Sequence, residues 1–317
     1  MQSLGAPIHP DARGARCILT MQSKAPISED PRSAEAQPPF KKQEQIEPPG
    51  LTSEMNPKPD HGEETYKGNG LLQGLAAVIT GADSGIGRAV ALAFAREGAD
   101  VVISYLNEEE DARETERLVT SAGSKALRIP GDIRSEEHCE KIIAQCVERF
   151  GKIDLLVNNA AFQSTYSDAR EISTEDFDRA FKTNVYATFF LSRAALRHMK
   201  PGAVIINTTS IQGFDPSGQL LHYAATKGAI ANMTRSLAEL AAQQGVRVNG
   251  VAPGPVWTPL IPSTMPEEKV KKFGQNTFFK RPAQPAELAP VYVFLASRLA
   301  SYVSGEIYGA TGGTMPL

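Results

Sequence analysis

Short apolar runs alternate with helical patterns along the chain from Leu75 onward. Runs such as "LAAVIT" and "DVVISY" are largely apolar, which is typical of strands buried on both faces of a sheet. Segments such as "GRAVALAFAREG" separate these runs and have the length and apolar spacing of helices. Repeated strands separated by helices predict a parallel sheet with helices on both faces and right-handed crossovers. The expected fold is therefore α/β, a single doubly wound Rossmann-type domain over residues 70–317.

The composition changes near residue 70. The preceding segment is rich in proline and charge and poor in apolar residues, so it cannot bury enough surface to fold alone. We expect a disordered tail over residues 1–38 and an extended arm over residues 39–69 that orders against the body or a neighbouring subunit. Disorder of the arm as well is the alternative. The first twenty residues lack a long apolar run, which argues against a secretory signal, whereas a weak transit peptide or initiation at Met21 stays open.

A glycine-rich turn follows the first expected strand and runs directly into a helix. In "TGADSGIG", the glycines at 81, 85 and 87 allow a tight turn, a close approach of backbone to a pyrophosphate, and close helix–strand packing. The N-terminus of the helix offers unpaired N–H groups and partial positive charge to that pyrophosphate. A glycine trio between a strand and a helix, first in a series of such units, predicts a dinucleotide-binding site.

The end of the second expected strand bears on the choice of nucleotide. An NAD site usually places an acid there to hold the ribose 2′-hydroxyl, but this strand ends Ser104-Tyr105-Leu106 with no acid before Glu108. A missing carboxylate removes a repulsion against a 2′-phosphate, which favours NADP(H), although no arginine takes its place and NAD(H) stays open. Asp132, after the third strand, is placed to meet the adenine edge, or else is a solvated turn residue.

A tyrosine and a lysine lie four residues apart in "LLHYAATKGAIANMTRSLAEL" and would therefore share one helix face. The ammonium of Lys227 would lower the pKa of Tyr223, normally near 10, and a bound pyridinium cation would lower it further. Ser210 ends the fifth expected strand, at the carboxyl edge where open α/β sheets bind ligands. Ser210 would donate a hydrogen bond to a carbonyl oxygen, and Tyr223 would deliver a proton to it.

These residues resemble the short-chain dehydrogenase/reductase family from Leu71 to the C-terminus. "NNAA" at 158–161 is similar to the family's NNAG motif, with Ala161 in place of glycine, and "PGPVWT" at 253–258 is similar to its PG motif. The resemblance implies a catalytic tetrad of Asn184, Ser210, Tyr223 and Lys227, in which Asn184 holds a water for proton relay. The cofactor contacts expected from the motifs and the resemblance are Gly81, Asp83, Ser84, Gly85, Ile86, Gly87, Tyr105, Asp132, Ile133, Asn159, Ala160, Tyr223, Lys227, Pro253, Gly254, Val256 and Thr258.

Within that family, the chain from about Lys42 resembles a bacterial subgroup of general-stress and NADP-dependent aldehyde-reductase proteins that carry a comparable arm. The resemblance implies reduction of a small or medium aldehyde or ketone. A sugar or polyol dehydrogenase, or a 3-oxoacyl reductase, is the alternative within the family. A nucleotide-sensing stress or scaffold protein is the alternative of another class. The long connection at 257–282 is expected to be a lid, with Gln212 and Trp257 in the substrate pocket. His222 would line the pocket floor or else face solvent.

Composition and charge limit the partners. The formal net charge of −3 carries no basic footprint for nucleic acid, and no apolar run reaches the roughly 18 residues that span a bilayer. The 3 cysteines are too few and too scattered for a disulfide framework, which predicts a reducing, cytoplasmic compartment, and no cluster indicates a metal. The helix at 221–241 is apolar on more than one face, and the family usually pairs such helices, so we expect a homotetramer.

Overall fold

The computed structural model describes residues 30–32 and 36–314. The chain divides into two units, Met1–Ser33 and Ala34–Leu317. In the first unit, the described residues form a turn in which Arg32 pairs with Asp30 at 2.6 Å. The predicted tail at 1–38 and the alternative start at Met21 therefore fall largely outside the described residues. The account that follows concerns the second unit.

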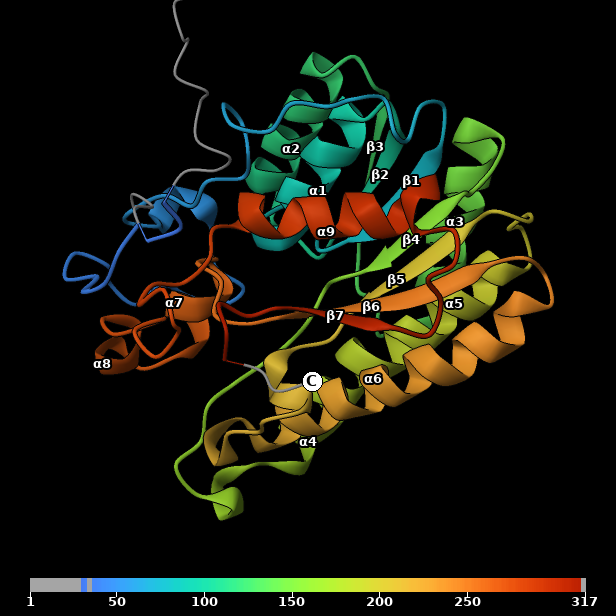
Figure 1. Cartoon of the computed structure of the whole chain (residues 1–317). Coiled ribbons are helices and arrows are strands. Elements are labelled where there is room, and N and C mark those ends of the chain that lie inside the picture. The colour runs from blue at the N-terminus through green and yellow to red at the C-terminus, as the bar shows by residue number, and fades with distance from the viewer. Residues whose placement is uncertain (1–29, 33–35, 315–317) are drawn as a thin grey trace, which may run out of the picture. The chain divides into compact units, whose positions relative to one another are not determined.

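The second unit is built on a parallel sheet, as the alternation of strands and helices predicted (Figure 1). In the described part of the chain the strand order is β3-β2-β1-β4-β5-β6-β7, and all neighbours pair parallel. The order reverses between β1 and β4, which creates the switch point where such sheets bind ligands. The strands are β1 (Ala76–Thr80), β2 (Asp100–Tyr105), β3 (Ala126–Pro130), β4 (Leu155–Asn158), β5 (Val204–Thr208), β6 (Arg247–Pro253) and β7 (Ile307–Ala310).

Helices cover both faces of this sheet (Figure 1). One face packs against α1 (Gly85–Arg96), α2 (Glu109–Ser121) and α9 (Pro285–Ala296). The other face packs against α3 (Glu136–Phe150), α5 (Ala187–Leu196) and α6 (Leu221–Ala242). The remaining helices are α4 (Thr174–Phe181) and two short ones, α7 (Leu260–Thr264) and α8 (Glu267–Val270). The doubly wound α/β fold predicted from the sequence is therefore confirmed.

The central strands are largely apolar because both of their faces are covered, whereas the edge strands β3 and β7 are less buried. All five residues of β1 are buried, and each aliphatic side chain removed from water in this way contributes about 1.5–3 kcal/mol. Capping residues mark the helix ends. At the start of α3 the Ser135 hydroxyl accepts a hydrogen bond from the amide of His138, and the helix stops at Gly151, which adopts a left-handed φ of 78°.

Residues 36–69 pack on the body through a separate apolar cluster. Ala36, Phe40, Ile46 and Met55 are buried there together with residues of the segment 257–270. The far end of the segment is held by α1, where the Tyr66 hydroxyl donates to the Glu97 carboxylate at 2.5 Å. That these residues gain their order only through such contacts, as an arm over 39–69, stays a prediction.

Candidate functional site

A cavity of about 360 Å³ lies at the carboxyl edge of the sheet, spanning the switch point. Of the residues that the sequence assigned to catalysis, cofactor or substrate, all but three line it. The lining residues of that set are Gly81, Asp83, Ser84, Gly85, Ile86, Tyr105, Asp132, Ile133, Asn159, Ala160, Ser210, Gln212, Tyr223, Lys227, Pro253, Gly254, Val256 and Thr258. The three that do not line it are Gly87, Asn184 and Trp257. Ala161, the departure from the family motif, lines it as well.

The glycine-rich turn has the geometry of an anion cradle. Gly81 and Gly85 adopt φ values of +61° and +50°, a region that side chains other than glycine rarely occupy. A Cβ on Gly87 would lie 1.9 Å from the carbonyl oxygen of Gly81, so only glycine lets α1 approach the turn. Gly87 therefore serves the helix–strand packing predicted for the third glycine, which explains its absence from the cavity lining.

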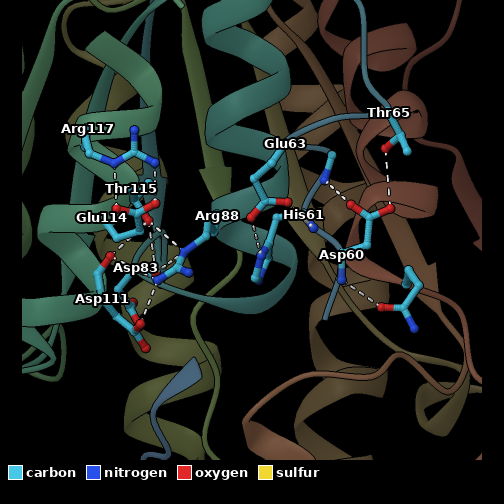
Figure 2. Close-up of polar contacts among 12 residues, drawn as sticks. Asp60, His61, Glu63, Thr65, Asp83, Arg88, Asp111, Glu114, Thr115 and Arg117 are labelled. Carbon is cyan, nitrogen blue, oxygen red and sulfur yellow. Dashed lines mark hydrogen bonds and ion pairs between the residues drawn. The ribbon is translucent and has the colours of Figure 1, made fainter. Parts of the chain in front are cut away.

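A buried arginine supports this turn from behind (Figure 2). Arg88 donates to the Asp83 carbonyl at 2.8 Å and pairs with the Asp111 carboxylate at 2.7 Å, with both side chains almost excluded from solvent. The Thr115 hydroxyl donates to the same carbonyl at 2.9 Å. Because an unpaired buried charge is strongly destabilising, Arg88 and Asp111 hold each other in place and fix the path of the turn.

Two carboxylates lie near the end of β2, although the strand end itself carries none. Asp83 and Glu108 both line the cavity and are buried, 6% and 8% exposed. Burial, with a smaller contribution from Glu108, raises the pKa of Asp83 to about 7. The end of β2 itself lacks an acid, as the sequence indicated, but the tertiary structure adds the carboxylates of Asp83 and Glu108 to the cavity near it.

The part of the cavity near Asp132 also carries arginines that the sequence analysis missed. Arg134 lines the cavity and pairs with Asp132 at 2.5 Å, and this bond holds the pKa of that carboxyl below its usual value. Asp132 is therefore a partly exposed residue that pairs with Arg134. Arg179, another lining residue, lies over the Phe162 ring with 4.1 Å between Cζ and the ring centroid. Neither arginine follows a recognisable motif, and α4 reaches the cavity only through tertiary packing.

The fold brings together three of the four predicted catalytic residues. Ser210 follows β5, and its hydroxyl lies near enough to Tyr223, which α6 supplies, to lower the pKa of the phenol. One turn along α6, the Lys227 ammonium lies 5.5 Å from the centroid of the Tyr223 ring and donates to the Thr208 carbonyl at 2.8 Å. Helical spacing alone thus places Tyr223 and Lys227 on one face, and the end of β5 adds Ser210 to it.

The electrostatics of this group differ from the expectation that the lysine lowers the pKa of the tyrosine. Burial raises the pKa of Tyr223 to about 12, and the nearby Ser210 side chain offsets only part of that rise. Burial also lowers the pKa of Lys227 to about 7. The expectation was wrong for the protein by itself because both side chains lie out of water, which disfavours both charged forms.

Asn184 stands behind the cavity in a π-helical turn, Lys182–Tyr186, between α4 and α5. Its side-chain oxygen accepts from the Phe162 amide at 2.8 Å, and its Nδ2 donates to the Phe162 carbonyl and to the Thr226 hydroxyl, each at 2.9 Å. Single π turns in helices occur often at functional sites. The side chain thereby joins the loop after β4 to α6 close to Tyr223.

Two expected pocket residues lie elsewhere. Trp257 is fully buried on the far side of its segment, with its ring stacked on Phe40 at 4.0 Å and its Nε1 donating to the Pro57 carbonyl at 2.7 Å. Its placement in the substrate pocket was wrong because residues 36–69 offer this large ring an apolar partner. His222 neither lines the cavity nor faces solvent, since α6 turns it toward the loop after β4, where its Nε2 lies 3.0 Å from the Ser164 hydroxyl.

The cavity wall opposite the sheet includes residues that sequence reasoning did not find. Pro48 and Pro49 reach the cavity from the N-terminal segment, and Phe162 and Gln163 come from the loop after β4. Gln163 also donates to the Thr264 hydroxyl at 2.8 Å across to the expected lid. Proline-rich composition indicated only that residues 39–69 cannot fold alone, and it carried no signal for which surface they would meet.

Comparison with known proteins agrees with this arrangement. A family model described as enoyl-(acyl carrier protein) reductase matches residues 81–315. The chain is 49% identical over 271 residues to general stress protein 39 of Bacillus subtilis, covering 86% of this chain and 95% of that protein. It is 47% identical over 282 residues to glucose and ribitol dehydrogenase of Daucus carota (87% and 97% covered). It is 46% identical over 281 residues to NADPH-dependent aldehyde reductase 1, chloroplastic, of Arabidopsis thaliana (86% and 98% covered).

A solved structure shares the fold at the level of the whole domain. The crystal structure of a short-chain dehydrogenase from Burkholderia cenocepacia in complex with NADP matches with a TM-score of 0.72 and 29% identity, over 77% of this chain and 98% of that one. The strand order and the cavity at the switch point define a Rossmann-type domain, and the family model and relatives place it among the oxidoreductases. Within that class, this chain belongs to the short-chain dehydrogenase/reductase family, as the motifs led us to expect. Among the described residues, no helix is long and apolar enough to cross a membrane.

Proposed function

We propose that this protein transfers a hydride between NADP(H) and the carbonyl carbon of a small or medium aldehyde or ketone, with alcohol oxidation as the reverse reaction. The observation that carries the proposal is the grouping of Ser210, Tyr223 and Lys227 on one cavity wall beside the glycine-rich turn. The names of the aldehyde-reducing relative and of the NADP complex support the choice of chemistry and of nucleotide.

The residues present fit a dinucleotide. The close packing at Gly87 and the left-handed backbone conformation of Gly81 and Gly85 leave the start of α1 open to a pyrophosphate. Val256 and Thr258 line the same cavity as Tyr223. When bound, the nicotinamide would supply the hydride and, in its oxidised form, a positive charge. Asp83 and Glu108 at the ribose corner favour NAD(H) as the second candidate, because carboxylates accept hydrogen bonds from a 2′-hydroxyl and repel a 2′-phosphate.

The chain's own residues would handle the oxygen of the substrate. Ser210 would donate a hydrogen bond to the carbonyl oxygen, and the Tyr223 hydroxyl would donate the proton that turns this oxygen into an alcohol. Burial holds Tyr223 protonated, as its raised pKa shows, so a proton donor is in place at neutral pH. Lys227 would stabilise the phenolate left behind, and a water held near Asn184 would return the proton through Lys227.

The sugar or polyol substrates of the alternative would use the same residues. The name of the carrot relative favours them. They differ from simple aldehydes by added hydroxyls, which need polar side chains of the cavity wall as hydrogen-bond partners.

An acyl-carrier substrate would need a basic docking face near the cavity. Lys271 is instead paired with Glu267 at 2.8 Å and with Glu268 at 3.0 Å, which weighs against a 3-oxoacyl reductase. A nucleotide-sensing protein would bind the cofactor without needing Tyr223.

The test compares NADPH and NADH consumption by the purified protein across short and medium aldehydes and a matched set of sugars. Tyr223→Phe removes only the phenol oxygen, and we expect turnover to fall by about 10³-fold while cofactor affinity stays unchanged. Turnover that survives in Tyr223→Phe would overturn the role of this residue. Cofactor binding without turnover on any carbonyl would favour the sensor.

We also propose a homotetramer. Four large apolar side chains on neighbouring helices are 41–65% exposed. They are Tyr186, just before α5, Phe189 on α5, and Leu221 and Leu240 on α6. Along α6, Leu237 and Ala241 pack on the sheet while Ala225 stays exposed, so the apolar surface continues beyond what the sheet covers. Native mass measurement at micromolar concentration checks this, and a monomer would contradict it.

A further inference from the structure

The first part of the expected lid, residues 257–273, also lines the cavity that holds Ser210, Tyr223 and Lys227. We call this part the lid, and its two sides differ. Toward the cavity it presents Thr258, Leu260, Thr264 and Phe273. Its other side carries Trp257 and Val270, which are buried although they do not face the sheet. Lids of this kind commonly close only when ligand binds. Here the outer side is already covered by another part of the chain.

The covering segment, which we call the strap (residues 40–57), contacts the lid at both ends of the lid. At the start of the lid, Phe40 stacks on Trp257 at 4.0 Å between ring centroids, and the indole Nε1 donates to the Pro57 carbonyl at 2.7 Å. Near its end, the Phe40 amide donates to the Lys271 carbonyl at 3.0 Å. One residue of the strap thereby ties together positions 257 and 271 of the lid.

The strap also contacts the backbone in the middle of the lid, through one side chain and one backbone amide. Gln45 donates through Nε2 to the Pro262 carbonyl at 2.5 Å, and the Ile46 amide approaches the same oxygen at 3.4 Å. Gly50 adopts a φ of +88°, and a Cβ there would lie 2.8 Å from the Pro259 carbonyl oxygen. A contact this close is available only to glycine, so the strap is shaped to this stretch of the lid.

The same strap is anchored to the opposite wall of the cavity. The Thr52 amide donates to the Asp111 carboxylate at 2.9 Å, and Asp111 pairs with Arg88, which holds the Asp83 carbonyl of the glycine-rich turn (Figure 2). Between these two attachments Pro48 and Pro49 line the cavity itself. A continuous chain of contacts therefore runs from the phosphate-binding turn, through the strap, to the lid.

We infer that the strap holds the lid at its working distance from the glycine-rich turn before cofactor binds, and that Phe40 and Trp257 are positioning residues for the cofactor site. The inference deepens the proposed function and rests on it. Ordering a mobile loop weakens binding, so a lid that is ordered beforehand should bind cofactor more tightly. The strap should thus act on cofactor affinity and leave the proton-transfer residues untouched.

The test uses Phe40→Ala in the full-length protein, with Tyr66→Ala as the matched control. Tyr66 is also an aromatic residue of the N-terminal segment, but it packs on α1 and bonds to Glu97 rather than to the lid. Both changes lower thermal stability. Only Phe40→Ala should weaken NADPH binding, by about tenfold, which corresponds to about 1.4 kcal/mol of lost preorganisation. In Phe40→Ala we expect kcat at saturating cofactor to change far less than KM, and in Tyr66→Ala we expect neither to change.

Two readouts report on the lid directly. Trp257 is the only tryptophan in the sequence, so a red shift of its emission in Phe40→Ala would show that the stack has opened. Amide exchange at Ile261, Ser263 and Met265, which bond within the lid, should become faster in the same variant. Gln45→Ala, at an exposed position, keeps the test available if Phe40→Ala does not fold, and it should show the same changes with smaller size.

Loss of stability in Phe40→Ala with unchanged NADPH affinity and unchanged exchange in the lid would overturn the inference, because the strap would then be structural only. Equal losses of affinity in Phe40→Ala and Tyr66→Ala would overturn it as well. Absence of NADPH and NADH binding by the wild-type protein is a distinct result, since it overturns the proposed function itself.

Discussion

The two walls of the cavity are built in different ways. The catalytic wall consists of strand ends and of α6, held by the backbone hydrogen bonds of one parallel sheet and by a motif that is local in sequence. The lid wall contains two short helices, α7 and α8, and is held by residues about 200 positions away in the chain. Helices this short are not stable alone, so the lid depends on its tertiary partners.

This difference separates chemistry from recognition. Ser210, Tyr223 and Lys227 need a rigid frame, because a shift of about 1 Å in a reacting group can cost about 10²-fold in rate. The lid needs to admit and release ligand, and its connection to the frame runs through side chains such as Gln163 and through the strap. Changes in the first wall should therefore affect kcat, and changes in the second wall should affect KM.

The largest contrast is expected between Ser210→Ala and Gln163→Ala. Removing the Ser210 hydroxyl should lower kcat by about 10²-fold, since one donor to a developing oxyanion is lost. Gln163→Ala removes the bond to Thr264, and we expect KM to rise by only about threefold, as for a single hydrogen bond of roughly 0.5–1.5 kcal/mol. Steady-state kinetics on one aldehyde measures both. A larger fall of kcat in Gln163→Ala than in Ser210→Ala would break the comparison.

A smaller set of changes tests how rigid the frame is. Gly87→Ala places a methyl 1.9 Å from the Gly81 carbonyl, so the turn must move, and we expect loss of cofactor binding together with a lower Tm. Gly228→Ala is the matched control, also in a helix, with 3.6 Å from its Cβ to the nearest other atom. It should be neutral or stabilising by up to about 1 kcal/mol, because alanine is the better helix former. Calorimetry and NADPH titration measure both, and similar results for the two variants would contradict this account.

The smallest effect concerns the buried carboxyl of the glycine-rich turn. The pKa of Asp83 rises from 3.8 to about 7 on folding, so between these pH values the folded state binds more protons than the unfolded state. Asp83 should therefore contribute less to the stability of the wild-type protein as pH rises through this window, and its contribution should stay at the lower level above it. Asp83→Asn lacks this loss, so its Tm advantage over wild type should grow from about pH 4 to about pH 7 and then level off.

Thermal melts without cofactor across pH 4–8 measure this difference in Tm. The range covers both pKa values of Asp83, that of the unfolded state and that of the folded state. Asp168→Asn is the control, because that carboxylate is exposed and bonded to Arg170, and its pKa lies below the usual value rather than above it. A constant difference between Asp83→Asn and wild type over the whole range would show that Asp83 is not held in the environment described here.

The sequence by itself determined the doubly wound fold, the glycine-rich turn and the face that unites Tyr223 with Lys227. Those features follow from periodicity and spacing, which act over a few residues. Only the tertiary structure decided that Trp257 faces the strap, and that burial raises the pKa values of Asp83 and Tyr223. These depend on which distant segments exclude water from a side chain, and local patterns along the chain carry no record of that.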